Sequence, residues 1–383
     1  MAAKVKQKFD AIETEMKDFF LERDSVIRGL IIALLSEQNI VFIGPPGTGK
    51  SLMVRNLAKR IITDSDEDYF EWLMTKYTKP EEILGPPNIK KLIDAIVEFN
   101  PEYKLPRAKI VYLDEIFKCN SSLLNCLLSA INEKIVYNGN RPMNIPLQML
   151  VGTSNEIPTD ESLKALYDRF RIRFETEYLR EPSNILKLIS KDSRGIPCEA
   201  KITMEELEEA RLQIDSCVSF PEEKQKLLGQ IVLALNEAGL RPSDRTINHV
   251  TEILKAEAWM NNRVEIEEYD MEIMEHMFWE DPAKRKEVRS IIFKIINPLG
   301  EKVMETYERC HQAYLKFVKD IKSAKKEERR GIIAETLNSM QTLYQEMNKD
   351  IKAMENENRP TARYESMAES LMLLITDIKT DYV

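Results

Sequence analysis

The fold that we expect follows from the stretch NIVFIGPPGTGKS, residues 39–51. Residues 39–43 are rich in β-branched and aromatic side chains, which predicts a short buried strand. The segment GPPGTGKS (44–51) comes next, and LMVRNLAKRI after it has the apolar spacing of a helix. A strand, then G-x-x-x-x-G-K-[ST], then a helix is the order of a phosphate-binding P-loop. We therefore expect an α/β P-loop NTPase fold with a parallel sheet flanked by helices.

The residues of this loop are suited to hold ATP and a magnesium ion. Glycines let backbone amides curl around the β-phosphate, and the N-terminus of the following helix adds positive potential. Lys50 is expected to reach the β- and γ-phosphates, and Ser51 is expected to ligate Mg²⁺. The predicted nucleotide-binding residues are Gly44, Pro45, Pro46, Gly47, Thr48, Gly49, Lys50 and Ser51.

Two further strand candidates end in polar residues. KIVYLDEI (109–116) closes on Asp114 and Glu115, and LQMLVGTSNE (147–156) closes near Asn155. Ligands of an open α/β sheet gather at the carboxyl ends of its strands. We expect Asp114 to hold the metal through water, Glu115 to orient or deprotonate the attacking water, and Asn155 to act as a polar sensor of that water and the γ-phosphate. The alternatives are a helix cap for the acidic pair and a turn or cap for the asparagine.

Three alternate arginines end the segment ESLKALYDRFRIRF (161–174). Arg169 follows the third strand by a loop and a short helix, which should carry it away from the P-loop of its own chain. Such an arginine must serve a phosphate of a neighbouring subunit, and a head-to-tail contact that closes generates a ring. Arg171 and Arg173 alternate with apolar residues, so we expect them to be solvated or to lie at an interface, with a direct phosphate role less favoured.

These motifs together resemble a known family. GPPGTGKS, VYLDEI, GTSNE and ALYDRF, in this order, are similar to an AAA+ ATPase of the MoxR family. LMTKYTKPEEILGP and the run from residue 105 to 139 resemble its RavA-like branch most closely. The resemblance implies that Arg169 is an arginine finger acting across a subunit interface.

Arg245 is the fourth candidate site residue. It stands in LRPSDRTINHV, near a helix start, where a cation is unfavourable to the helix dipole and calls for an anion. The resemblance implies that Arg245 is a second sensor, reaching from a helical lid to the γ-phosphate of the same chain. A salt bridge to the surrounding acids remains the alternative, and Arg241 is a weaker candidate for the same role.

The family resemblance also sets the functional expectation. It implies an ATP- and Mg²⁺-dependent ring, expected to be a hexamer, that remodels or assembles protein clients with a von Willebrand factor A-type partner. One alternative is a nucleotide-gated scaffold with slow hydrolysis. Another is a nucleic-acid motor, supported only by basic residues such as Lys90, Lys91 and Lys104.

Composition narrows these possibilities. The chain has 383 residues, a formal net charge of -9 and five cysteines without a C-x-x-C pair. An acidic balance argues against duplex DNA as the default partner. The unpaired cysteines, short apolar runs and lack of a signal-like start lead us to expect a cytoplasmic protein without a membrane span.

We expect four segments along the chain. They are an N-terminal helix (1–23), an AAA+ α/β nucleotide-binding domain (24–180), an all-α lid (181–281) and a three-helix C-terminal bundle (282–383). The bundle is predicted from apolar residues that recur at steps of three and four, with breaks near NPLG (297–300), RRGI (329–332) and NRPTA (358–362). The β-rich domain that RavA-like proteins insert there is not visible, so the resemblance does not extend to a partner carried by it.

Two insertions in the nucleotide-binding domain are expected to face a pore or a client. The first covers residues 85–108, and the second, 132–146, is predicted to be a β-hairpin with Tyr137, Asn138 and Gly139 at its tip. Surface loops of no special use remain the alternative.

Overall fold

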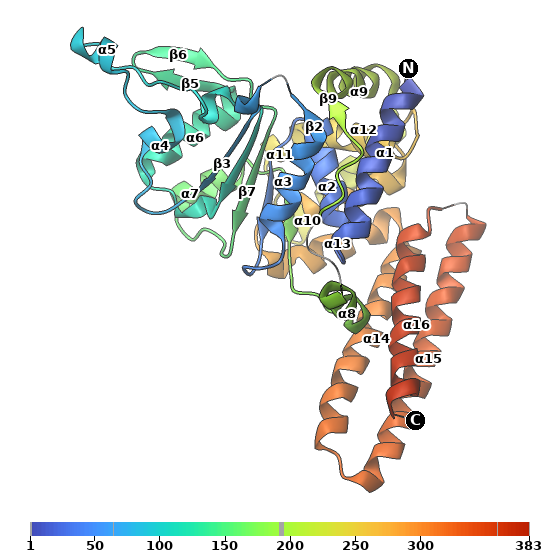
Figure 1. Cartoon of the computed structure of the whole chain (residues 1–383). Coiled ribbons are helices and arrows are strands. Elements are labelled where there is room, and N and C mark those ends of the chain that lie inside the picture. The colour runs from blue at the N-terminus through green and yellow to red at the C-terminus, as the bar shows by residue number, and fades with distance from the viewer. Residues whose placement is uncertain (1, 64, 191–194, 358, 383) are drawn as a thin grey trace. The chain divides into compact units, whose positions relative to one another are not determined.

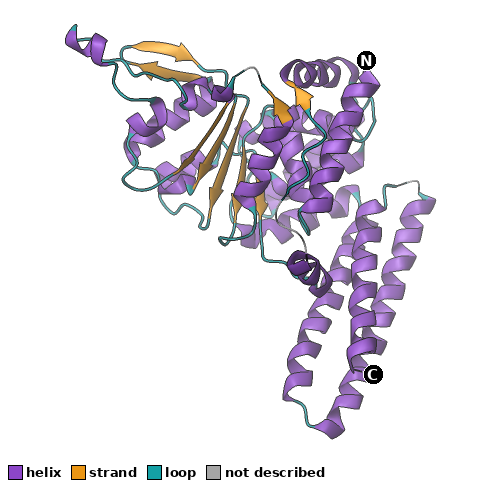
Figure 2. Ribbon diagram, viewed as in Figure 1, coloured by secondary structure: helices purple, strands orange, loops and turns teal. Residues whose placement is uncertain are grey.

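A computed structural model of the chain describes residues 2–63, 65–190, 195–357 and 359–382. Its centre is a parallel five-stranded sheet with the strand order β3-β4-β7-β1-β8 (Figures 1 and 2). The sheet confirms the predicted P-loop strand and the two strands with polar ends, within one or two residues at each end. Its strands are β1 (Ile40–Ile43), β3 (Tyr69–Leu73), β4 (Ile110–Asp114), β7 (Met149–Ser154) and β8 (Ile172–Glu175).

The register of the sheet places the polar strand ends together where the parallel strands finish, a side of the sheet that we call its carboxyl edge. Ile43 pairs with Ser154, and Leu113 pairs with Gly152, so β1, β4 and β7 finish at nearly the same level. Every residue of β1 and β7 is buried, as expected for parallel strands covered by helices on both faces. The helices that follow or cover these strands are α2 (Asp24–Leu35), α3 (Lys50–Arg60), α6 (Ser121–Glu133) and α7 (Glu161–Tyr167).

Helix α2 packs tightly against the edge strand β8. A Cβ atom added to Gly29 would lie 2.2 Å from Cε2 of Phe174, so this helix approaches the strand as closely as glycine allows. The contact matters for the site because β8 follows directly from the segment that carries Arg169.

The helical lid packs on α1 (Ala2–Phe19) and α2. Arg28 joins these layers, because its guanidinium lies 2.9 Å from carboxylate oxygens of both Glu13 on α1 and Glu257 on the lid. The lid and its 3-10 turn are formed by α9 (Met204–Cys217), α10 (Glu222–Glu237), α11 (Asp244–Asn248), α12 (Val250–Met260) and η4 (Glu268–His276).

The segment before the lid is held by a buried arginine. Arg60, at the end of α3, is fully buried and donates to the carbonyls of Pro197 at 2.6 Å and Ala200 at 3.2 Å, and it pairs with Glu15 at 2.6 Å. A small parallel pair, β2 (Ile61–Ile62) with β9 (Ile202–Thr203), completes this junction.

The two insertions are joined to each other. The predicted hairpin is confirmed as β5 (Ile135–Asn138) and β6 (Arg141–Asn144). The Asn138 side chain accepts from the Phe99 backbone N at 2.5 Å and donates to the Phe99 O at 3.1 Å. Helix α4 (Pro80–Leu84) precedes the first insertion. The insertion itself contains the short helix α5 (Ile89–Ile93) and ends with the 3-10 turn η2 (Leu105–Arg107).

The chain divides into two compact units, residues 1–179 with 191–285 and residues 180–190 with 286–383. The N-terminal helix, the sheet and the lid thus share one unit. The second division falls inside α13 (Pro282–Ile296), a few residues beyond the expected boundary at 281. The second unit also contains α8 (Pro182–Ser190), which falls within the range expected for the lid.

The C-terminal helices pack on one another, and the predicted apolar stripes form their buried faces. One predicted break is wrong. The chain turns at Ala324 and Lys325, and Gly331 lies inside the next helix, where a Cβ atom would have no described neighbour within 4 Å. The helices are α14 (Pro298–Ser323), α15 (Lys326–Asn356) and α16 (Ala362–Tyr382). Among the described residues, no helix combines the length and apolar character needed to cross a membrane.

Candidate active site

The P-loop begins at a glycine that the fold requires. Gly44 has a φ of 152°, and a Cβ there would lie 2.0 Å from the carbonyl oxygen of Thr176. Gly49, with a φ of 83°, precedes the first residue of α3. No described atom lies within 4 Å of the position its Cβ would take, so the open side of the loop has room for a ligand. The backbone amides of the loop and the N-terminus of α3 are therefore available to an anion.

Lys50 is held within the curve of this loop. Its ammonium donates to the carbonyl oxygens of Gly44 at 2.6 Å and Pro45 at 2.8 Å. Burial lowers the pKa of Lys50, and the carboxylates of Asp114 and Glu115 oppose that shift. The charge of Lys50 is thus positioned beside the acidic strand end.

A chain of hydrogen bonds links Ser51 to Asp114. Ser51 Oγ lies 2.9 Å from the hydroxyl of Tyr112, which lies 3.2 Å from Oγ1 of Thr153. Thr153 in turn donates to Asp114 Oδ1 at 2.5 Å. Hydroxyl and carboxylate oxygens are the donors that Mg²⁺ prefers, so this set fits the cation expected with ATP. No sequence pattern indicates that Tyr112 takes part in these hydrogen bonds, because in the sequence it resembles one more apolar strand residue.

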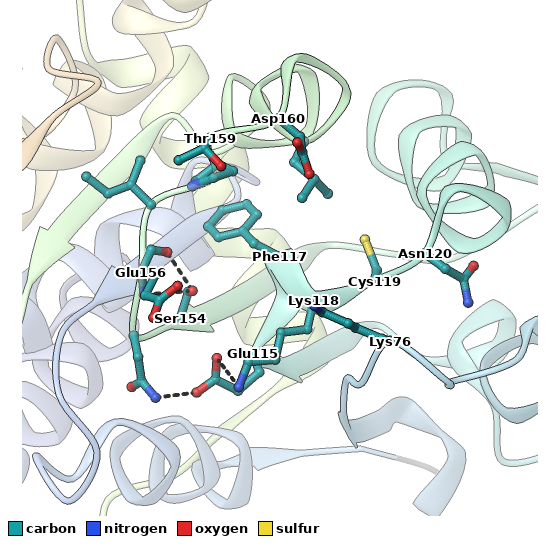
Figure 3. A pocket seen from close by; sticks show the side chains of 14 residues that line it. Lys76, Glu115, Phe117, Lys118, Cys119, Asn120, Ser154, Glu156, Thr159 and Asp160 are labelled. Atoms are coloured by element: carbon teal, nitrogen blue, oxygen red, sulfur yellow. Dashed lines mark hydrogen bonds and ion pairs between the residues drawn. The ribbon is translucent and has the colours of Figure 1, made fainter.

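Glu115 is fixed by neighbours on two sides. Its backbone is left-handed, with a φ of 54°, a strained value for a non-glycine residue. Its carboxylate accepts from Asn155 Nδ2 at 2.5 Å and pairs with Lys118 Nζ at 3.3 Å. Figure 3 shows Glu115, Lys118 and Lys76 together in a cavity of about 600 Å³. The predicted base and the predicted sensor are therefore in direct contact.

Arg23 is a residue beside the P-loop that motif reasoning missed. Its side chain is buried, and it donates to the carbonyl oxygens of Glu177 and, at 3.5 Å, of Thr48. Burial lowers the pKa of this guanidinium. Only its place at the start of the apolar helix α2 sets it apart in the sequence.

Arg169 lies at the opposite edge from the P-loop, where the parallel strands begin. Its Nε donates to Asn132 Oδ1 at 3.1 Å, and its Nη1 donates to the carbonyl oxygen of Ala165. A cavity of about 630 Å³ beside it is lined by Asn39, the residue before β1, and by Arg245. The P-loop begins after the last residue of β1, about 16 Å further along the strand at roughly 3.3 Å per residue. Arg169 therefore cannot reach the P-loop of its own chain.

Arg245 lies beside Arg169 and not beside the P-loop. Its Nη1 is 2.9 Å from Asp168 Oδ2, and it lines the same cavity as Arg169. This placement does not fit the expectation that Arg245 reaches the γ-phosphate of its own chain. The salt bridge left open as the alternative is the interaction that the structure contains.

Arg171 and Arg173 are expected to be solvated or to lie at an interface, and the solvated alternative is wrong. They are 5% and 3% exposed, and both η4 and α2 contact the edge strand β8. Arg173 donates to the carbonyl oxygens of Met277, at 3.4 Å, and Trp279, and it stacks 4.6 Å from the centre of the Tyr167 ring. Burial lowers the pKa of Arg171 to about 10. Alternation along a strand could not reveal that both of its faces would be covered.

A P-loop, an acidic strand end and a helical lid around this strand order define an AAA+ P-loop NTPase. Residues 7–214 match the family described as the MoxR domain in the MoxR-vWA-beta-propeller ternary systems. Residues 224–292 match an AAA lid domain. The chain belongs to the MoxR family.

Two proteins of Methanocaldococcus jannaschii and one solved structure are also similar to this chain. The uncharacterized proteins MJ0079 and MJ0812 of Methanocaldococcus jannaschii are 35% and 36% identical, over 80% and 78% of this chain and 79% of each relative. The crystal structure of a candidate ATPase from Cytophaga hutchinsonii shares the fold, with a TM-score of 0.60 and 20% identity. It covers 77% of this chain and 94% of that one.

Proposed function

We propose that this protein hydrolyses ATP with Mg²⁺ in a ring of identical subunits and uses the cycle to remodel or assemble a protein client. The observation that carries the proposal is the separation of two half-sites. The P-loop and Glu115 stand at the carboxyl edge of the sheet, and Arg169 lines a cavity at the other edge, where Asn39 lies about 16 Å from Gly44 along β1. One subunit therefore supplies only part of a complete catalytic site to its own nucleotide.

The carboxyl edge would bind the nucleotide. Lys50 would exchange the carbonyls of Gly44 and Pro45 for phosphate oxygens, and Ser51 and Asp114 would hold the metal. The bound ion would neutralise charge on the transferred phosphoryl group. Glu115 would accept the proton of the attacking water, and Asn155 would keep the carboxylate aimed at it.

The opposite edge would complete the site of the next subunit. Arg169 would stabilise the charge that develops on the neighbour's γ-phosphate, and Arg245 would act in the same direction because it lines the same cavity. A head-to-tail contact of this kind closes into a ring when its rotation allows. A hexamer is the ring size we propose.

The partner proposal comes from the family. The matched family is described by ternary systems of MoxR, vWA and beta-propeller proteins. We propose a von Willebrand factor A-type protein as the partner that delivers the client, with a beta-propeller protein as a further component. Membership of the RavA-like branch and a cytoplasmic location remain predictions.

A mixing experiment tests the shared site. Arg169→Ala subunits keep Glu115, and Glu115→Gln subunits keep Arg169, so a mixed ring contains interfaces with both residues intact. Random pairing makes about a quarter of the interfaces complete. We expect turnover to rise from near zero in each variant to roughly that fraction of the wild-type rate.

The control uses the double variant. Mixing Arg169→Ala/Glu115→Gln subunits with either single variant creates no complete interface, so turnover should stay at background. Co-assembly is verified by native mass spectrometry of subunits with different tags. Rings that contain both single variants and yet show no recovery would refute the trans site.

A nucleotide-gated scaffold is a second candidate. The Glu115 carboxylate pairs with Lys118 at 3.3 Å and also accepts a hydrogen bond from Asn155. Together these contacts restrict the rotation of the proposed base. Hydrolysis could then be a slow timer for partner release. Single-turnover rates that stay slow with a vWA partner present would favour this function over remodelling.

A further inference from the structure

Asp168 connects the lid to the segment that carries the proposed finger. Its carboxylate accepts from Ser243 Oγ at 2.8 Å and pairs with Arg245 Nη1 at 2.9 Å. Ser243 is also the N-cap of α11, whose second residue is Arg245. The residue that follows Asp168 in the chain is Arg169. The carboxylate of Asp168 therefore links the start of α11 to the segment that carries Arg169, the proposed arginine finger.

The surroundings of this carboxylate are rich in cations. Arg171 donates to the Asp168 backbone carbonyl, and its buried Nε has no hydrogen-bond partner among the described residues. Arg169 and Arg211 line the same cavity as Arg171 and Arg245. Lys134 is a further cation there, and the acids that line it are Glu37, Glu133, Asp215 and Glu252. In this setting Asp168 is the anion that occupies Arg245.

We propose that Asp168 is a positioning residue that competes with the neighbour's γ-phosphate for Arg245 and so lowers the preference of ring assembly for ATP over ADP. The inference rests on the proposed function, because it needs a neighbour's nucleotide to approach this cavity. Arg245 leaves Asp168 only for a stronger anion. The terminal phosphate of ATP, held beside Arg169, is such an anion, and ADP lacks it.

The physical reason is a difference between two ion pairs. The side chains of Arg245 and Asp168 are 45% and 29% exposed. A pair that is exposed to this degree changes an equilibrium by no more than about 5-fold, because solvent screens it. Such a pair is weak enough for a phosphate to displace, yet it still holds the lid arginine when no γ-phosphate is present. Removing the carboxylate should therefore help assembly with ATP more than assembly with ADP, because only the ATP-bound interface has to break the pair.

The experiment measures assembly of the full chain against nucleotide concentration. Mass photometry gives the concentration of ATP and of ADP, each with Mg²⁺, at which half of the subunits are in rings. The selectivity for ATP is the ADP concentration divided by the ATP concentration. For Asp168→Asn we expect the selectivity for ATP to rise about 3- to 5-fold, the factor equivalent to one partly exposed pair.

Three further variants separate the proposal from a structural role. Arg245→Ala removes the competed group, so adding Asp168→Asn to it should change the selectivity no further. Ser243→Ala removes one hydrogen bond of the Asp168 carboxylate but leaves the ion pair, and we expect a smaller increase in the selectivity. Asp168→Glu keeps the charge and should retain most of the wild-type selectivity.

Two results would overturn the inference. One is a folded Asp168→Asn protein, with a wild-type melting temperature, whose selectivity is unchanged or lower, or whose assembly changes equally with both nucleotides. The other is the same increase when Asp168→Asn is made in the Arg245→Ala background. If these occur while the mixed Arg169→Ala and Glu115→Gln rings recover turnover, the trans site stands and only the role of Asp168 fails. Without that recovery, both proposals fail.

Discussion

The two edges of the sheet are built in different ways. At the carboxyl edge, Gly44, Glu115 and Asn155 each come directly after a parallel strand, so the strand register brings them together. At the opposite edge, the cavity beside Arg169 is lined by residues from five separate stretches between positions 35 and 252. The first half-site is a property of local motifs. The second depends on how the lid packs against the sheet.

This contrast separates nucleotide binding from turnover. The proposed nucleotide site at the carboxyl edge lies within one chain, because its groups are held by the sheet. At the opposite edge, the two arginines proposed to act on the neighbour's nucleotide donate to acceptors of their own chain. Arg169 donates to Asn132, and Arg245 donates to Asp168. Substitutions at the two edges should therefore affect binding and turnover differently.

The largest effect is expected from Arg169→Ala. Turnover should fall about 10³- to 10⁵-fold, the range for loss of an arginine finger. The affinity of the monomer for ATP should stay unchanged, since the P-loop is about 16 Å away along β1. Steady-state hydrolysis and binding of a fluorescent ATP analogue measure the two quantities. A large loss of monomer affinity would show that the two edges are not independent.

Glu115→Gln should have the next largest effect. Loss of a general base lowers the rate by about 10²- to 10⁴-fold, and ATP should remain bound because Lys50 and Ser51 are intact. Filtration of the protein with labelled ATP checks the retained nucleotide. Lys118→Ala is the matched control, since it removes the other partner of Glu115 but not the base. Its turnover should stay far closer to the wild type.

Gly29→Ala tests the scaffold between the two edges. The added methyl would lie 2.2 Å from the Phe174 ring, and overpacking of this kind lowers the free energy of unfolding by about 1–3 kcal/mol. Gly229→Ala on α10 is the control. No described atom lies within 4 Å of the Cβ position there, so it should be neutral or slightly stabilising. Urea unfolding monitored by circular dichroism measures both.

The smallest effect concerns His249 at the edge of the Arg169 cavity. Burial lowers its pKa, Glu252 opposes the shift, and Arg171 and Arg245 add to it. The unfolded chain then takes up a proton before the folded chain as the pH falls below about 6.5, so the free energy of unfolding decreases in that window. We expect His249→Gln to lose less stability than the wild type between pH of about 7.5 and 5.5. Urea unfolding at both pH values would contradict this if the two proteins lost equal stability.

Local patterns predict the three central strands of the sheet, the P-loop, the hairpin and the three C-terminal helices because each has its own signal, whereas they do not predict the edge strand β3. Alternation, a glycine-rich loop or a seam of apolar residues is enough to identify these elements. The break expected near Gly331 is wrong because glycine lowers helix propensity by only about 1 kcal/mol. Packing of the rest of α15 outweighs that cost.

The contacts that long-range packing creates could not be predicted in this way. Arg171 and Arg173 alternate along the chain like exposed residues, yet helical segments more than 70 residues later cover them. Tyr112 resembles an ordinary strand residue and becomes a link between Ser51 and Asp114. Each outcome depends on a partner that is distant in sequence.

The fold class, the P-loop and the acidic strand end can be derived from the amino-acid sequence alone, because a parallel sheet brings together the residues at the carboxyl ends of its strands. The separation of Arg169 from the P-loop can be derived in the same way. The pairing of Arg245 with Asp168 beside Arg169 emerges only in three dimensions, since that contact depends on how the lid helices pack onto α1 and α2. Strand register is a local rule, whereas the position of the lid results from packing between distant segments.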